Sequence, residues 1–160
     1  MPNHSLNISI PRQAQSNWCW AAVAEVIDTF YAGAAQHRQC HIVNGVLQRN
    51  DCCVVPGSVR CDVPASLEDA LKHISRWAGT HSFAQTWTHV DMELGKGRPV
   101  GVLVKLIGGG GHFVTITGNG TQANQVLTVD DPHQGRTTTT HAMLAKSFHG
   151  VWAATYDTRP

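Results

Sequence analysis

The chain has no block of Lys or Arg residues, and its formal charge at pH 7 is only +1. A protein that binds nucleic acid through the phosphates needs a basic patch, so this balance argues against nucleic acid as a partner. No apolar run approaches the length of a membrane span. The N-terminus has neither a basic segment nor a long apolar one, so no signal peptide is visible. The 160 residues, 42% of them hydrophobic, suit one globular domain with its own core.

Four of the five cysteines lie close together, between positions 40 and 61. An even number of this kind predicts two disulfides, which form in an oxidising compartment such as the periplasm or outside the cell. A bridge between the adjacent Cys52 and Cys53 is sterically poor. Two pairings remain open: Cys40–Cys53 with Cys52–Cys61, or Cys40–Cys52 with Cys53–Cys61. A zinc site built from these thiols and His41 is the rival interpretation, which the lack of a clean CxxC pair disfavours.

The fifth cysteine, Cys19, lies in the most informative stretch of the chain, QAQSNWCWAA (residues 13–22). Apolar spacing predicts a buried helix from about 19 to 31, ended by Gly33, with Ser16 or Asn17 as its N-cap. Cys19 then lies in the first turn, where unpaired backbone N–H groups and the helix dipole favour a thiolate over a thiol. A lone cysteine is ordinarily a buried structural thiol. The position at the helix start favours a nucleophile instead.

The order of residues around and after this cysteine resembles that of the papain-like cysteine peptidases. Their pattern is a Gln six residues before a Cys-Trp pair that begins a long helix, followed late in the chain by a His and then an Asp or Asn. The chain resembles their compact bacterial branch, which includes the leader peptidases of bacteriocin exporters and secreted effector proteases. The resemblance implies that Cys19 is the nucleophile and Gln13 the oxyanion-hole residue; Gln15 competes but lacks the spacing. Trp18 and Trp20 are then packing residues that wall the cleft.

The His and Asp of this pattern lie in the second half of the chain. His112 follows four glycines, whose open backbone would let a substrate chain approach the ring, and the resemblance makes it the general base. The glycines do not form a phosphate loop, because they precede a strand and no Lys-Ser/Thr follows. Asp130 and Asp131 end a later strand before Pro132. In the resemblance the Asp directly before Pro, Asp131, orients the His; Asp130 is second choice because neighbouring strand residues face opposite ways.

Helical patterns precede strand patterns along the chain. After an extended lead-in over residues 1–12, further helices are expected over about 36–47, 67–77 and 90–94. Strands are expected over about 99–106, 112–117, 125–129, 137–140 and 150–156. This order predicts an α+β fold. The resemblance implies one papain-like domain over 1–160, with a helical lobe at about 13–96 that carries the Cys, packed on an antiparallel β lobe at about 97–158.

Together these patterns predict a cysteine endopeptidase that hydrolyses protein or peptide substrates with a Cys-His-Asp triad and needs no metal or organic cofactor. The resemblance suggests a secreted bacterial effector or a toxin domain delivered into another cell, and a toxin would need an immunity or inhibitor protein in its producer. Export without a cleaved leader, or as part of a larger polypeptide, would reconcile the disulfides with the missing signal peptide. Two alternatives remain: transglutaminase-like or deamidase acyl transfer by the same triad, and a non-catalytic, disulfide-stapled binding module.

Overall fold

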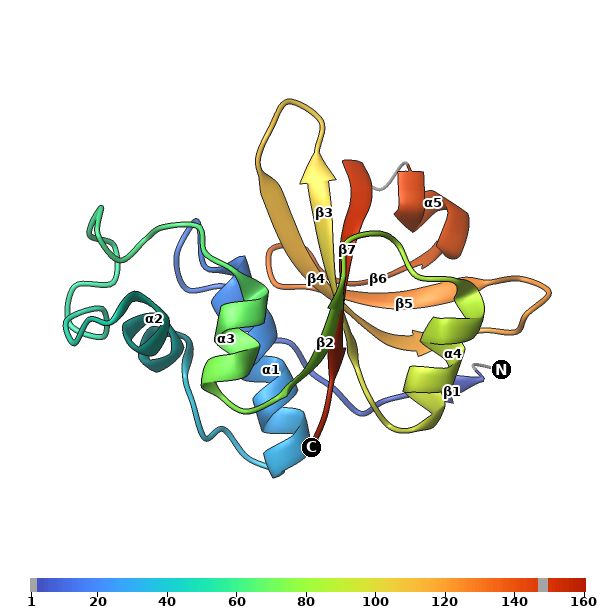
Figure 1. Cartoon of the computed structure of the whole chain (residues 1–160), viewed down its shortest axis with the longest axis horizontal. Helices are drawn as coiled ribbons and strands as arrows, with labels where there is room; N and C mark the ends of the chain where they lie inside the picture. Colours follow the sequence, from blue (N-terminus) through green and yellow to red (C-terminus); the bar gives the residue numbers. More distant parts are fainter. Residues whose placement is uncertain (1–2, 147–149) are drawn as a thin grey trace.

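A computed structural model describes residues 3–146 and 150–160 and shows a seven-stranded antiparallel sheet with helices on both faces (Figure 1). The strand order is β2-β7-β3-β4-β5-β6, and β1 pairs with β4. The strands are β1 (His4–Ser5), β2 (Trp77–His81), β3 (Val100–Leu106), β4 (Gly111–Asn119), β5 (Val126–Asp131), β6 (Gly135–Thr140) and β7 (Gly150–Thr158). The helices are α1 (Cys19–Ala32), α2 (Gln39–Leu47), α3 (Leu67–His73), α4 (Trp87–Gly95) and α5 (His141–Lys146). In this part of the chain no helix is long and apolar enough to cross a membrane.

The two faces of the sheet bury separate hydrophobic clusters. Strand side chains alternate between faces, so Leu103 of β3 packs with α1–α3 while Val102 and Val104 pack with α4 and α5. Phe113 of β4 and Tyr156 of β7 continue the first cluster. The α+β layout predicted from the order of helices and strands is therefore confirmed, with α1–α3 on one face (Figure 1).

Helix α1 is buried along most of its length and begins, as predicted, at Cys19. It ends where Gly33 adopts a left-handed conformation (φ 76°) and donates its N–H to the carbonyl of Thr29. The predicted side-chain cap is wrong: the N-cap residue is Trp18, and no side chain caps the helix. Asn17 is bonded elsewhere, because its backbone N–H and side-chain amide both donate to Asp62.

Several helix boundaries differ from the sequence predictions. The second helix begins at Gln39 rather than 36. The third is capped by Ser66 as expected but ends at His73 rather than 77, because Ser75 has a left-handed φ of 63°. The chain then forms β2, which pairs with β7. Thr86 caps α4, which begins three residues earlier than predicted. Neither α5 nor β1 was predicted.

The disulfides follow the first of the two open pairings, Cys40–Cys53 and Cys52–Cys61. The zinc interpretation of this region is therefore wrong, because the four sulfurs form two disulfide bonds and leave no thiolate for a metal. The loop that they staple is held against the start of α1 by both tryptophans, whose indole N–H groups donate to backbone carbonyls: Trp18 to Cys61 at 2.8 Å and Trp20 to Val63 at 3.1 Å.

Part of the range expected for the helical lobe, about 13–96, belongs to the sheet. Strand β2 forms one edge by pairing with β7, and α4 packs on the face opposite α1–α3. At the chain's start, β1 pairs with β4 through Ser5 and Gly118. Segments from both halves of the sequence therefore build the same sheet.

Candidate active site

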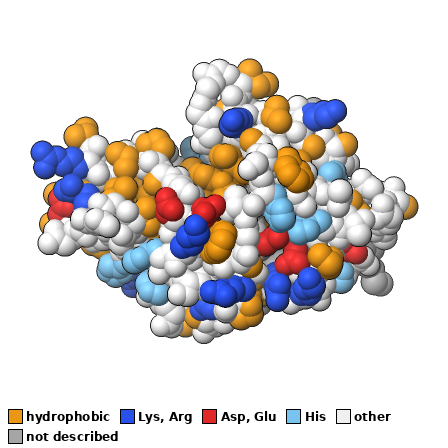
Figure 2. Space-filling view, in the orientation of Figure 1, with side chains coloured by type: hydrophobic (Ala, Val, Ile, Leu, Met, Phe, Trp, Pro, Cys, Tyr) orange, Lys and Arg blue, Asp and Glu red, His pale blue; other side chains and the backbone are white. Residues whose placement is uncertain are grey.

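A cavity of about 500 Å³ lies between the first turn of α1 and the hairpin of β3 and β4. Figure 2 shows the molecule hollowed between the part that carries α1–α3 and this hairpin, with hydrophobic side chains around the hollow. The lining combines apolar walls with a few polar groups, as in many ligand sites. Its residues are Gln13, Ser16, Asn17, Cys19, Trp20, Pro64, Ala65, Val104, Leu106, Gly110, Gly111, His112, Phe113, Asp131, His133 and Gln134.

Cys19 is the first residue of α1 and lines this cavity. All five cysteines lie in the described part of the chain, and Cys19 is the one with a free thiol. Only 8% of the residue is exposed. The N–H groups of a first helical turn have no partner within the helix and can donate to a ligand. Trp20 walls the cavity, whereas the buried Trp18 packs beneath the disulfide loop and does not line it.

His112 and Asp131 meet in the same cavity. Nε2 of His112 donates to Oδ1 of Asp131 at 2.8 Å, which leaves Nδ1 for the Cys19 thiol. The same carboxylate oxygen accepts the backbone N–H groups of His133 (2.7 Å) and Gln134 (3.1 Å). A turn at Gly108–Gly110, where φ is 96°, 105° and 81°, brings the chain into β4 just before His112. Such values favour glycine, which explains the glycine run.

The electrostatics of the site favour a charged imidazole. Burial lowers the pKa of His112, but the hydrogen bond that it donates to Asp131, the nearby Cys19 sulfur and the negative charges of both groups more than offset this and raise the pKa to about 9. Burial likewise opposes ionisation of Asp131, yet its hydrogen bonds with His112 and the turn hold the pKa of that carboxyl below its ordinary value. An imidazolium between a carboxylate and a thiol is the arrangement that stabilises a thiolate.

Asp130, the second choice for this position, points away from His112. Its carboxylate pairs with Arg136 (2.9 Å to Nε) and accepts the hydroxyl of Thr117. Arg136 in turn donates to the carbonyl of Ile8, so this network ties the lead-in segment to β5 and β6. The alternation along β5 therefore separates the two carboxylates as expected.

Gln13 lines the cavity, but its amide is already engaged. Nε2 donates to the carbonyls of Gln15 at 3.0 Å and Ser16 at 2.8 Å, and Oε1 is buried without a partner among the described residues. The backbone N–H of Gln13 donates to the carbonyl of Pro132. The segment is thus fixed beside the turn that holds Asp131.

Sequence reasoning did not name two residues that shape the site. His133 and Gln134 line the cavity, and their N–H groups hold the Asp131 carboxylate. The sequence Asp131-Pro132-x-x-Gly135 is typical of a turn. An Asp that begins a turn commonly accepts such N–H groups, so this signal could have found them.

The comparisons with known proteins agree with this geometry. A family model described as "Papain-like cysteine protease AvrRpt2" matches residues 2–149. The chain belongs to this family. It is thus a papain-like cysteine protease, which confirms the resemblance seen in the sequence around Cys19.

A solved structure shows the same fold. A double glycine motif protease from an AMS/PCAT transporter, solved with its leader peptide, has 16% sequence identity and a TM-score of 0.55; the match covers 98% of this chain and 95% of that one. The Pseudomonas avirulence protein AvrPphB has 11% identity and a TM-score of 0.44, with 96% of each chain covered. No curated protein matches significantly.

Proposed function

We propose that the protein is a cysteine endopeptidase that uses Cys19 as nucleophile, His112 as general acid–base and Asp131 to orient the imidazole. The observation that carries the proposal is the bond of 2.8 Å from His112 Nε2 to Asp131 in the cavity that holds the free Cys19 thiol. The thiolate attacks the scissile carbonyl, and the imidazolium protonates the leaving amine. Water then hydrolyses the acyl-enzyme, with His112 as base.

The oxyanion would be stabilised by backbone N–H groups in the first turn of α1, that of Cys19 first among them. Gln13 would add a side-chain donor once its amide exchanges a bond to Gln15 or Ser16 for one to the substrate. This step needs no metal or organic cofactor.

The substrate we propose is a protein or peptide bound along the open side of the cavity. The end of β3, at Val104 and Leu106, lines one side of the cavity and Pro64–Ala65 another, which suits an extended chain with apolar side chains. The protease of the same fold that was solved with a leader peptide supports a peptide as occupant.

We propose further that the enzyme works as a secreted effector or toxin domain, in an oxidising setting or after crossing one. Two disulfides within a chain of 160 residues support this, because such bonds are rare in reducing compartments. A toxin of this kind would pair with an immunity protein in its producer. We also propose that residues 1–160 form a single domain.

The test is a product analysis with a casein or peptide-library substrate, in the presence and absence of a primary amine. The wild type should release new N-termini, and Cys19→Ala and His112→Ala should each abolish this because each removes a group that the covalent step needs. Iodoacetamide at mildly acidic pH should label Cys19 in the oxidised protein. Amine incorporation or ammonia release without cleavage would instead identify acyl transfer or deamidation, and a Cys19 that labels only above about pH 8 would argue against an activated thiol.

A further inference from the structure

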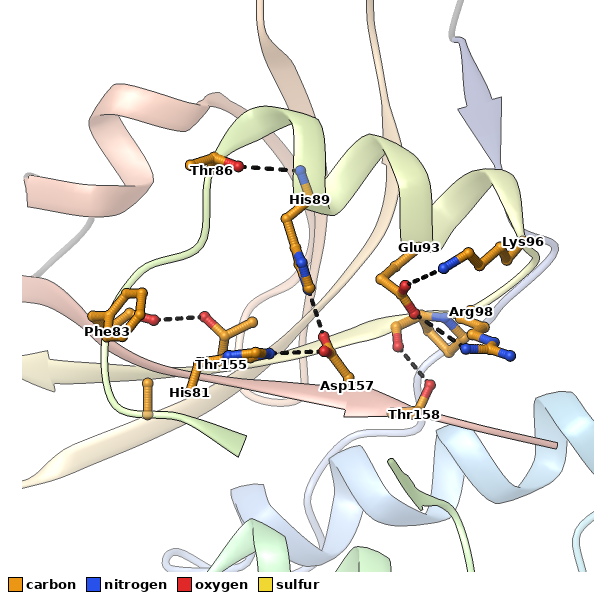
Figure 3. A network of polar contacts seen from close by, with 12 residues as sticks. His81, Phe83, Thr86, His89, Glu93, Lys96, Arg98, Thr155, Asp157 and Thr158 are labelled. Carbon is orange, nitrogen blue, oxygen red and sulfur yellow. Dashed lines mark hydrogen bonds and ion pairs between the residues drawn. The ribbon is translucent and has the colours of Figure 1, made fainter. Parts of the chain in front are cut away.

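A second cluster of titratable side chains lies away from the cavity. Asp157 accepts two hydrogen bonds, both at 2.8 Å: Oδ2 from Nε2 of His81, and Oδ1 from Nε2 of His89. Figure 3 shows the two rings pointing at the carboxylate, His81 from the end of β2 and His89 from the first turn of α4. None of these three residues lines the cavity that contains Cys19.

The fold places these side chains together through three elements. On the paired strands β2 and β7, Asp157 lies opposite Gly79, so His81, two residues further along, projects from the same face. A side chain at Gly79 would meet no atom within 4 Å, which leaves the carboxylate room on that side. Thr86 caps α4 by accepting the N–H of His89, and this fixes the turn that carries the second ring.

The ligand atoms of the cluster converge closely enough for one ion. The two imidazole nitrogens and a carboxylate oxygen all lie within 4.8 Å of one another. We propose that His81, His89 and Asp157 bind a zinc ion. Two His and one carboxylate, with a fourth position open to water, are a common donor set for Zn²⁺.

The geometry requires only a small adjustment. Ligand distances of about 2.0–2.1 Å in a tetrahedron separate neighbouring donor atoms by about 3.3 Å, compared with the 2.8 Å of each present hydrogen bond. On metal binding each imidazole would give up the Nε2 proton that now bonds to Asp157, carry its proton on Nδ1 and turn the Nε2 lone pair to the metal. The side chains of His81, His89 and Asp157 are 34%, 18% and 15% exposed, so an ion and its water can enter.

Neighbouring groups leave this donor set free for a metal. Asp91, the next carboxylate on α4, already accepts the side-chain amides of Asn3 and Asn119. Glu93, one turn after His89, is paired with Lys96 at 2.9 Å and Arg98 at 3.6 Å (Figure 3). Among the described residues, the two other groups with converging donors are Cys40 with His41 and Cys53, and Asp51 with Cys52 and Cys61. Their cysteines are joined in disulfides and offer no thiolate. Zinc in the His-His-Asp cluster would join α4 to β2 and β7.

The test is calorimetric titration of the oxidised full chain with zinc chloride at pH 7.5. Cys19→Ala serves as background, because a free thiol beside His112 could itself bind zinc. One zinc should bind per chain. His81→Ala and Asp157→Asn should each weaken binding by more than about 100-fold, since loss of an outer-shell partner alone costs about 10–100-fold.

His41→Ala is the matched control, an exposed His on α2 beside the disulfides, and it should bind zinc like the background protein. Circular dichroism checks that each variant folds. Asp157→Asn keeps the shape of the side chain, so it still tests the site if His81→Ala fails to fold. Cobalt titration should give the visible bands of a tetrahedral site in the background and lose them in Asp157→Asn. No zinc binding by the background, or equal binding by all variants, would overturn the proposal.

Discussion

At the scale of single residues, the two adjacent carboxylates at the end of β5 have different surroundings and so different expected roles. Asp131→Ala should lower kcat by about 10 to 10⁴-fold, because it removes the group that orients His112. The N–H groups of His133 and Gln134 also lose their acceptor, so a smaller loss of stability should accompany the loss of turnover. Asp130→Ala leaves the buried hydroxyl of Thr117 without its acceptor and removes the partner of Arg136. It should therefore cost about 1–3 kcal/mol of stability and spare kcat.

Steady-state kinetics and urea unfolding of both variants measure these effects. If Asp130→Ala loses turnover while Asp131→Ala keeps it, the two carboxylates exchange roles. If both keep full turnover, a Cys19–His112 dyad remains.

The raised pKa of His112 predicts a specific pH dependence. kcat/KM should fall at high pH with an apparent pKa near 9, as the imidazolium loses the proton that the leaving amine needs. Asp131→Asn removes the carboxylate that raises the pKa, whereas the burial that lowers it remains. The high-pH limb should then move to lower pH. Asp69→Asn, on the exposed side of α3, is the matched control and should leave the limb in place.

The same group links stability to pH. Because the pKa of His112 is higher in the folded protein than its ordinary 6.5, its contribution to stability is fully present below about pH 6.5 and is lost as the pH rises through about 9. Urea unfolding across this range should show a loss in the wild type that is smaller in Asp131→Asn. An equal loss in both would show that another group is responsible.

At the scale of elements, the helices and strands that were predicted correctly are those with a clear local pattern of apolar and turn residues. The buried helix α1 and its end at Gly33, and the strands β3 to β5, follow from apolar spacing and turn residues. Strand β2 could not be predicted, because its residues show no alternation and its pairing with β7 joins segments far apart in the sequence. The six residues of α5 are too few for a helical period to show. The N-cap of α1 was predicted wrongly because Asn17, one of the two expected caps, is hydrogen-bonded to Asp62 instead.

The site was predictable to a similar degree. The spacing of Gln13 and Cys19 and the Asp-Pro turn carried enough information to name residues that the fold brings into one cavity. Local sequence could not reveal that the amide of Gln13 bonds to nearby carbonyls, nor that His81, His89 and Asp157 converge, because both depend on tertiary positions.

The disulfide-stapled loop between α2 and α3 forms one wall of the cavity, and its two bridges should differ in their effect on activity. Each closes a loop of about 10–14 residues, so replacing either pair by Ser should cost about 3 kcal/mol. In the Cys52–Cys61 bridge, Cys61 itself accepts the indole N–H of Trp18, and Val63 just after it accepts that of Trp20. The next two residues, Pro64 and Ala65, line the cavity. Its loss should raise KM more than loss of Cys40–Cys53, which makes no such bond to Trp18 or Trp20.

Thermal unfolding and KM of the two double-Ser variants separate these effects, and the Cys40→Ser/Cys53→Ser variant is the matched control. Equal KM values at equal losses of stability would show that the loop contributes stability alone.

At the scale of the whole molecule, strands from both ends of the chain belong to one sheet, and the two sites that we propose lie at different places on it. The cavity with Cys19 lies where α1 meets the β3–β4 hairpin, and the zinc cluster lies where β2, β7 and α4 meet. Helix α1 also contacts the last strand, since the hydroxyls of Tyr31 and Thr158 lie 2.6 Å apart. The N–H of Arg159 donates to the carbonyl of Arg76. The end of the chain thus fastens the α1–α3 layer to the sheet.

This interlocking predicts that the protein unfolds in one cooperative step. The two hydrophobic clusters share the sheet, and strands from the first half of the sequence, β1 and β2, pair with strands from the second half. Opening the α1–α3 layer would therefore expose the buried face of β3, β4 and β7, so neither layer should persist alone. Pulsed hydrogen exchange with mass spectrometry, on the oxidised chain at increasing urea concentrations, measures each layer separately. Peptides from α1 and from β5 should become labelled over the same range of urea; labelling of α1 at clearly lower urea would mean two separately folding units and would contradict the single domain that we propose.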